Sequence, residues 1–231
     1  MRLITIPKKY ALTRGHIACL GEVATLNVTR GCGGGCVFCF ARCFSGAPPS
    51  GTVGVDPNLP ALLRQELDSP RRKRPLPAFV VMSTASDAFL GGPEVALLAR
   101  ACLEVLLNRN IGVSLSTRGV IPDAVLALLQ RHASRVRITI PLPSLSQDYV
   151  RRWEPRAATP DERLFMVQKL QELVIQPNVR LDPIIPFVND TTESLRQLLS
   201  ALQSLGIDRG TVSFLQLRPG VAQQITDEAP L

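Results

Sequence analysis

The sequence predicts an α/β fold, a partial (β/α)6 TIM-like barrel built on a parallel sheet. Six short β-rich runs alternate with helical patterns, several of these runs are almost continuously apolar, and no long polar linker divides the 231 residues. Alternating strands and helices form parallel sheets with right-handed crossovers, and strands covered on both faces are apolar throughout. Six units leave a barrel open where eight would close it, so a flat doubly wound sheet is the structural alternative.

The predicted strands are rich in apolar and β-branched residues. They are Val23–Thr29, Phe79–Ser83, Gly112–Thr117, Val136–Ile140, Val179–Ile184 and Thr211–Leu217. The predicted helices are Leu59–Leu67, Pro93–Leu107, Pro122–His132, Asp161–Val174 and Thr191–Leu205. Asp190 is the expected N-cap of the last helix and Gly206 its stop.

We expect residues 1–231 to form a single domain, with the barrel over about 22–219 and the active site at the carboxyl ends of its strands. No apolar stretch reaches the roughly 18 residues of a membrane helix, and the N-terminus has no signal-peptide pattern. These features predict a soluble, cytoplasmic protein without a membrane partner. The net charge of +7 permits an anionic partner. The basic run Arg71–Arg74 lies between two prolines, which indicates an exposed loop.

Four of the six cysteines fall within twelve residues, in the loop over 30–43. Cys32, Cys36 and Cys39 have the spacing C-x3-C-x2-C. Thiolates hold iron–sulfur clusters, and four of them would saturate a four-iron four-sulfur cubane. Three leave one iron free to bind the amino and carboxylate groups of S-adenosylmethionine. The interspersed glycines permit the tight backbone path that such a loop needs.

A zinc site is the alternative interpretation of the loop, with Cys19 or Cys43 as the fourth ligand. In that case the chain would be a non-catalytic zinc or iron–sulfur module. Cys43 is also a candidate hydrogen-atom donor. Cys102 lies on an apolar helix face and is expected in the core.

The cysteine spacing, followed by the aromatic Phe40, resembles the signature of the radical S-adenosylmethionine (radical SAM) superfamily. The flanking segments Asn27–Cys32 and Cys39–Arg42 resemble the spore photoproduct lyase-related, DNA repair photolyase-like family. Further segments resemble that family in the same order along the chain: Ser83–Asp87, Ser116–Arg118, Glu154-Pro155 with Arg163-Leu164, Pro183–Pro186 with Asn189-Asp190, and Leu217-Arg218.

The resemblance implies the partial barrel, a 4Fe-4S cluster on the three cysteines and S-adenosylmethionine as cofactor. It places Phe40 beside the adenine and makes Ser86, Arg118 and Thr139 contacts of S-adenosylmethionine. Arg163 is expected either to pair with Glu154 or to reach the cofactor. The family's chemistry also implies an electron donor, either a reductase or a protein of the ferredoxin or flavodoxin type.

The expected activity is reductive cleavage of S-adenosylmethionine to a 5′-deoxyadenosyl radical, which abstracts hydrogen from an unidentified substrate. A nucleic-acid lesion lyase of the spore photoproduct lyase type is the alternative. Thr84 argues against that alternative, because it stands where those lyases have the cysteine that returns a hydrogen atom. Val28, Thr29, Phe38 and Phe40 also depart from the family pattern, which has Pro and Tyr there.

Overall fold

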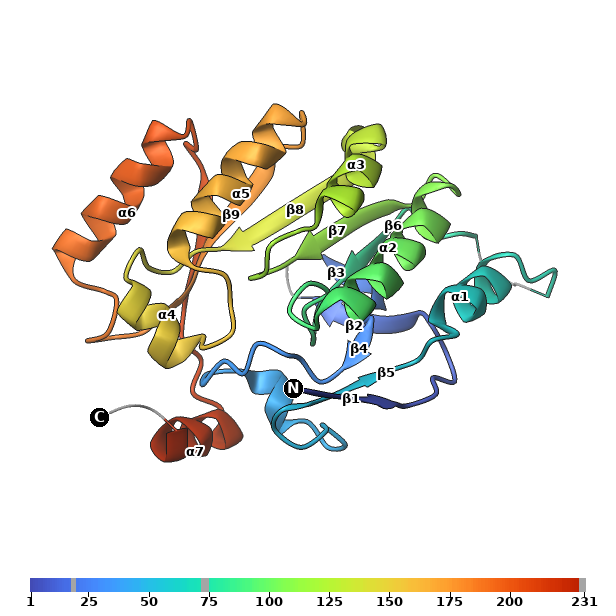
Figure 1. The fold of residues 1–231 in the computed structure, drawn as a ribbon, viewed down its shortest axis with the longest axis horizontal. Coiled ribbons are helices and arrows are strands. Elements are labelled where there is room, and N and C mark those ends of the chain that lie inside the picture. Colours follow the sequence, from blue (N-terminus) through green and yellow to red (C-terminus); the bar gives the residue numbers. More distant parts are fainter. Residues whose placement is uncertain (18–19, 72–74, 229–231) are drawn as a thin grey trace.

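The computed structural model describes residues 1–17, 20–71 and 75–228 (Figure 1). Cys19 and the residues 72–74 of the basic run lie outside these ranges. A seven-stranded sheet in the order β10-β9-β8-β7-β6-β3-β2 forms the body of the fold, and a three-stranded sheet in the order β1-β5-β4 lies beside it. Similarity to solved partial barrels, reported below, confirms the predicted fold class.

Six parallel strands occupy the positions that the apolar runs predict. They are β3 (Gly21–Leu26), β6 (Phe79–Met82), β7 (Gly112–Ser116), β8 (Val136–Pro141), β9 (Pro177–Ile184) and β10 (Gly210–Phe214). The seventh strand, β2 (Thr13–Ile17), runs antiparallel to β3 and was not predicted. It contains a glycine and charged residues, so its sequence has no strand signal.

Five helices agree with the predictions within a few residues. They are α1 (Leu59–Leu67), α2 (Pro93–Leu107), α3 (Asp123–Arg131), α5 (Pro160–Glu172) and α6 (Thr192–Ser204). The predicted N-cap of α6 was wrong: Thr191 caps it by accepting from Ser194 N, whereas Asp190 Oδ1 accepts from Phe187 N at 2.8 Å. A threonine hydroxyl can also cap a helix, and Asp190 stabilises the turn before the helix instead.

The helices cover one face of the large sheet, and the hydrophobic core lies between the two layers (Figure 1). Alternate strand residues point into this core, among them Met82, Leu115 and Ile138, and they pack with helix residues such as Leu103 and Leu106. The residues between them on the strands face the other side and are only half-buried, as period-two alternation requires. The sheet therefore has one apolar face and one open, more polar face.

Two strands of the small sheet, β4 and β5, lie before and after the cysteine loop in the chain. β1 (Arg2–Thr5) pairs with β5 (Thr52–Val55), and β5 pairs with β4 (Thr29–Arg30), directly before the first cysteine. After the last strand, α7 (Pro219–Glu228) lies against the 3-10 turn η1 (Phe40–Cys43). An ion pair of 2.5 Å between Arg42 Nη2 and Glu228 joins the two.

Two further elements complete the description: the short helix α4 (Gln147–Trp153) and the 3-10 turn η2 (Ala133–Arg135). Among the described residues, no helix is long and apolar enough to cross a membrane. The assignment of residues 1–231 to a single domain stays a prediction.

Candidate cluster and cofactor site

The cysteine loop turns tightly around Gly34. A Cβ atom at this position would lie 3.6 Å from the sulfur of Cys32 and 3.6 Å from that of Cys36, and Gly34 N donates to Cys32 Sγ at 3.4 Å. At Gly33 a Cβ would lie 1.8 Å from the carbonyl oxygen of Leu90, so only glycine fits. The sulfurs of Cys32 and Cys36 thus lie on the side of Gly34 where any other residue would have a side chain.

The thiols of Cys32, Cys36 and Cys39 are free of disulfide bonds. In the described part of the chain, no three His, Cys, Asp or Glu side chains converge closely enough to hold a single metal ion. The donor set nevertheless fits an iron–sulfur cluster, because it supplies three soft sulfur ligands and a backbone N–H aimed at one of them.

Burial governs the charge of these thiols. It raises the pKa of Cys32 to about 11, and the nearby carboxylate of Asp87 acts in the same direction. Burial also raises the pKa of Cys36 far above its ordinary value, and the guanidinium of Arg118 opposes this shift. Without a bound cation both thiols hold their protons at neutral pH, so metal binding at this loop must release protons.

Arg118 follows β7 and is held at its backbone by Asp87. One oxygen of this buried carboxylate accepts from Arg118 N at 2.7 Å, and the other accepts from Thr117 Oγ1 at 2.7 Å and from Phe89 N at 2.9 Å. Burial raises the pKa of Asp87, and these hydrogen bonds act against that rise. Asp87 therefore fixes the point at which the arginine leaves the sheet.

The guanidinium of Arg118 is held by Glu154, whose side chain is fully buried. Arg118 Nε donates to Glu154 Oε1 at 2.8 Å, and Nη2 donates to the carbonyl of Asp182 at 2.9 Å. The group also lies 5.5 Å from the centre of the Phe38 ring. Its Nη1 makes no hydrogen bond to a described residue. Arg118 is one of the residues that line the cavity described below.

Arg163 lies behind Glu154. Its Nη2 donates to Glu154 Oε2 at 2.5 Å, which confirms the predicted pairing of these two residues. Its Nε and Nη1 donate to the carbonyls of Ala158 and Pro141, both at 2.9 Å. Arg163 is 1% exposed and does not line the cavity. The alternative expectation, a contact of Arg163 with the cofactor, stays a prediction.

A cavity of about 280 Å³ opens beside these groups. It brings together two of the three predicted cluster ligands, Cys36 and Cys39, with the predicted cofactor residues Phe40 and Arg118. The other lining residues are Phe38 and residues at the ends of β9 and β10: Asp182, Pro183, Ser213, Phe214, Leu215, Gln216 and Arg218. The guanidinium of Arg218 lies 5.6 Å from the centre of the Phe40 ring.

Ser86 and Thr139 lie outside this lining. Ser86 is buried and its hydroxyl donates to Asn27 Oδ1 at 3.5 Å. Thr139 is half-buried in the middle of β8, where its hydroxyl accepts from Asn178 Nδ2 at 3.3 Å. The proposed contacts of both with S-adenosylmethionine stay predictions.

Asn27 ties the end of β3 to the Ser83–Asp87 segment. Its Nδ2 donates to Thr84 Oγ1 at 2.9 Å, and its Oδ1 accepts from Ala85 N at 2.8 Å. Ser83 has a φ of 64°, in the left-handed region, and its buried hydroxyl has no hydrogen-bond partner in the described structure. The segment that bears Thr84 is thus fixed beside the cysteine loop.

Sequence reasoning missed Tyr149. It lies in α4, is 4% exposed, and packs with Val37, Trp153 and Ile185 beneath the cysteine loop. Its hydroxyl has no hydrogen-bond partner among the described residues. Burial raises the pKa of Tyr149, and the carboxylate of Glu154 adds to that effect. A buried hydroxyl without a partner calls for an explanation, and this one lies next to the cysteine loop.

Two further cysteines are described, Cys43 and Cys102. Cys43 is exposed, with its sulfur 4.0 Å from Gln224 Oε1 of α7. Cys102 is fully buried in α2, as predicted, and burial raises its pKa to about 12.

Comparisons with known proteins agree with this geometry. Residues 26–214 match the sequence model of the Radical SAM superfamily. An uncharacterized protein of Acidianus two-tailed virus, ORF301, is 26% identical over 201 residues, which are 82% of this chain and 66% of the relative. The uncharacterized protein Rv2578c of Mycobacterium tuberculosis is 27% identical over 207 residues, which are 84% of this chain and 59% of the relative. The chain thus spans less than two thirds of the length of these relatives.

Solved structures share the fold. Spore photoproduct lyase complexed with dinucleoside spore photoproduct has a TM-score of 0.73 at 16% identity, covering 99% of this chain and 67% of the other. A mutant of that lyase with bound AdoMet has a TM-score of 0.74 at 15% identity and the same coverage. Streptococcus suis SuiB bound to S-adenosylmethionine has a TM-score of 0.54 at 16% identity, covering 88% of this chain and 46% of the other. The sequence match and the shared partial barrel show that the chain belongs to the radical SAM superfamily.

Proposed function

We propose that this protein holds a 4Fe-4S cluster on Cys32, Cys36 and Cys39 and cleaves S-adenosylmethionine reductively to abstract hydrogen from a substrate. One observation carries the proposal. The loop that turns around Gly34 presents free thiols next to a cavity shared with Phe40 and Arg118. Thiolates, an aromatic ring and a fixed guanidinium are the groups that an iron–sulfur cluster, an adenine and a carboxylate need.

The protein's own residues bind and orient in this proposal. Arg118 has an N–H group free to bind the carboxylate of the cofactor, and Glu154 keeps its guanidinium in place. Phe40 offers its exposed ring to the adenine, while Ser86 and Thr139 are proposed polar contacts. Arg163 acts as a positioning residue through Glu154. When bound, the cluster would supply the electron that splits the sulfonium and yields a 5′-deoxyadenosyl radical.

The proposal does not name a substrate, and a second candidate function would supply one. The similarity to spore photoproduct lyase and the charge of +7 favour a nucleic-acid lesion lyase as the second candidate. Thr84 disfavours it, because a hydroxyl O–H bond is too strong to replace a thiol as hydrogen donor. The proposed activity also needs an electron donor, a reductase or a protein of the ferredoxin or flavodoxin type, and we propose a cytoplasmic location.

Anaerobic reconstitution tests the proposal. The wild-type protein should take up about four irons per chain, as a cubane requires, and form 5′-deoxyadenosine from S-adenosylmethionine under dithionite. Cys39→Ala should lose both properties, while the matched control Cys43→Ala should keep them. Stoichiometric zinc without iron would instead support a zinc site, and loss of the metal in Cys43→Ala would identify Cys43 as its fourth ligand.

A further inference from the structure

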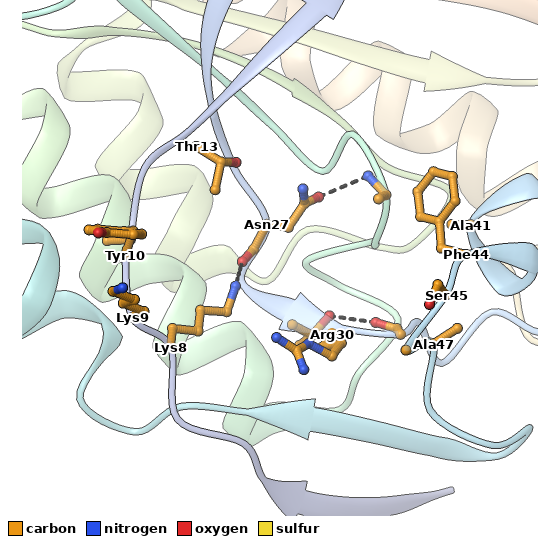
Figure 2. Close-up of a pocket in the computed structure, with 15 residues that line it drawn as sticks. Lys8, Lys9, Tyr10, Thr13, Asn27, Arg30, Ala41, Phe44, Ser45 and Ala47 are labelled. Carbon is orange, nitrogen blue, oxygen red and sulfur yellow. Dashed lines mark hydrogen bonds between the residues drawn. The ribbon is translucent and has the colours of Figure 1, made fainter.

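A second cavity lies apart from the one that Arg118 and Phe40 line. It has a volume of about 500 Å³ and lies between the N-terminal segment, the end of β3 with β4, and the residues after η1 (Figure 2). We call it the basic cavity. Its lining residues are Lys8, Lys9, Tyr10, Ala11, Thr13, Asn27, Thr29, Arg30, Gly31, Ala41, Phe44, Ser45, Gly46, Ala47 and Ala85.

The charged side chains that line the basic cavity are all positive. Lys8, Lys9 and Arg30 line it, and none of the lining residues is acidic. Arg30 and Lys9 are exposed and form no ion pair within the described residues. Lys8 is half-buried and donates to the carbonyl of Asn27. Burial lowers the pKa of Lys8, and Arg30 acts in the same direction. An anion in the cavity would offset this unfavourable accumulation of positive charge.

The carboxylate of Asp56 lies near the basic cavity without lining it, and both of its oxygens already accept hydrogen bonds. Asp56 is buried, and its two oxygens accept from the backbone N–H groups of Lys8 at 2.7 Å and Asn58 at 2.9 Å. The amide of Asn27 is also engaged: its Nδ2 donates to Thr84 Oγ1, and its Oδ1 accepts from Ala85 N. The lining groups that distinguish this cavity are therefore its three cations and its two aromatic rings.

Two aromatic rings flank the cations. In Figure 2, Tyr10 and Phe44 stand at opposite sides of the view, with Lys8 and Arg30 between them. The rings are 58% and 49% exposed. Lys9 Nζ lies 5.4 Å from the centre of the Tyr10 ring, and Phe44 packs against Phe40, so a ligand would contact the part of each ring that stays exposed. Exposed aromatic faces beside cationic groups bind flat rings that carry negative charge.

The basic cavity adjoins the cofactor site. Phe44 meets Phe40 edge to face, with ring centres 5.4 Å apart and an angle of 73° between the planes. Gly31, Ala41 and Ala85 also line a further cavity, which differs from the two above and is lined by Cys32 and Cys39 as well. A ligand in the basic cavity would thus lie next to the groups proposed to hold the cluster and the adenine.

We propose that the basic cavity binds a small phosphomonoester carried on a flat ring, and that this molecule is the substrate or part of it. Three cations without a lining carboxylate fit the charge of nearly −2 of a phosphomonoester better than a single negative charge. Arg30 can bind two phosphate oxygens as a fork. The volume suits one small molecule. Identifying the ligand as substrate rests on the proposed function, whereas its binding does not.

Isothermal titration of the full-length, anaerobically reconstituted protein tests the binding. Phenyl phosphate is expected to bind at least about tenfold more tightly than inorganic phosphate, and benzyl alcohol not measurably, since ring and charge act together. Arg30→Met and Lys9→Met should each weaken phenyl phosphate at least about fivefold, whereas the exposed Arg131→Met should bind as wild type. Tyr10→Ala should weaken phenyl phosphate but not inorganic phosphate.

Absence of phenyl phosphate binding, or affinity unchanged by Arg30→Met, would overturn the proposal. Binding of a single-stranded oligonucleotide without terminal phosphate, while phenyl phosphate does not bind, would also overturn it in favour of a nucleic-acid surface. Iron content and 5′-deoxyadenosine formation are measured on the same samples. Phenyl phosphate binding by a protein that takes up no iron would support the site while rejecting the proposed function.

Discussion

Glu154 holds Arg118 at the edge of the 280 Å³ cavity that also contains Phe40, with 2.8 Å between Glu154 Oε1 and Arg118 Nε. The other carboxylate oxygen binds Arg163, so one buried anion lies between two guanidinium groups. Such an arrangement is stable only when each charge is paired, because an isolated buried charge is costly. Glu154 therefore couples the stability of the fold to the orientation of the residue proposed to bind the cofactor.

The first prediction is that Glu154→Gln lowers both stability and cofactor affinity. It leaves two cationic groups without their anion, and breaking a buried ion pair costs about 3–5 kcal/mol. Urea unfolding should show this loss, and titration should show weaker binding of S-adenosylmethionine at normal iron content. Glu193→Gln is the control, since its carboxylate is exposed on α6. Lower stability with unchanged affinity would make Glu154 purely structural.

The second prediction concerns Arg118 itself. Arg118→Ala should weaken S-adenosylmethionine binding by about 1.5–3 kcal/mol, the usual contribution of a hydrogen bond to a charged group. Iron uptake should stay at the wild-type level, because the three cysteines are untouched. Titration calorimetry and iron analysis measure the two effects, with the exposed Arg151→Ala as control. Unchanged affinity would remove Arg118 from the proposed binding site.

The third prediction uses the two tyrosines of the chain, Tyr149 and Tyr10. The hydroxyl of Tyr149 is buried without a partner among the described residues, and such a group costs about 1–3 kcal/mol. Tyr149→Phe should therefore stabilise the metal-free protein against urea, whereas the exposed Tyr10→Phe should not.

In the iron-loaded protein the same substitution should lower the reduction potential, if the hydroxyl donates to a cluster sulfur. Potentiometric titration followed by electron paramagnetic resonance measures this shift, with Tyr10→Phe again as reference. A potential equal to that of wild type would show that Tyr149 does not contact the bound cluster.

The strands and long helices could be predicted because their patterns are strong. β6 to β10 are short segments that combine apolar and β-branched residues, and α2 is fifteen residues long with an apolar face. β2, β4 and α4 were missed because they are short and their pairing is decided by tertiary contacts. α7 was missed for a similar reason: of its described residues, Val221 alone is buried.

The site residues likewise fall into those that a sequence pattern identifies and those that only tertiary contacts bring together. Cysteine spacing identifies the loop, and the family resemblance brings Phe40 and Arg118 to it. The contact of Arg118 with Glu154 joins residues 36 positions apart and follows only from the folded chain. Tyr149 has no sequence signal, because an aromatic residue on an apolar helix face is typical of a core. The basic cavity joins the N-terminal segment to the residues after η1, a pairing that no local pattern predicts.

The last prediction is that this protein does not repair the spore thymine dimer in multiple turnovers. Repair that regenerates S-adenosylmethionine needs a weakly bound hydrogen to quench the product radical. Thr84 holds the expected position, and its oxygen accepts from Asn27 Nδ2 at 2.9 Å, so the position is well ordered but lacks a thiol. Cys43 lies against α7, with its sulfur near Gln224. Cys19 is outside the described residues.

Reduced, reconstituted protein incubated with dimer-containing DNA should therefore restore little thymine, as measured by chromatography of the digested DNA, and 5′-deoxyadenosine should accumulate slowly as an uncoupled product. Thr84→Cys restores a thiol at the position and should raise the ratio of thymine to 5′-deoxyadenosine, if this DNA enters the site. Multiple-turnover repair by the wild-type protein would contradict the prediction. Cys43→Ala and Cys19→Ala would then show which thiol replaces the missing donor, because only the variant without that thiol would lose turnover.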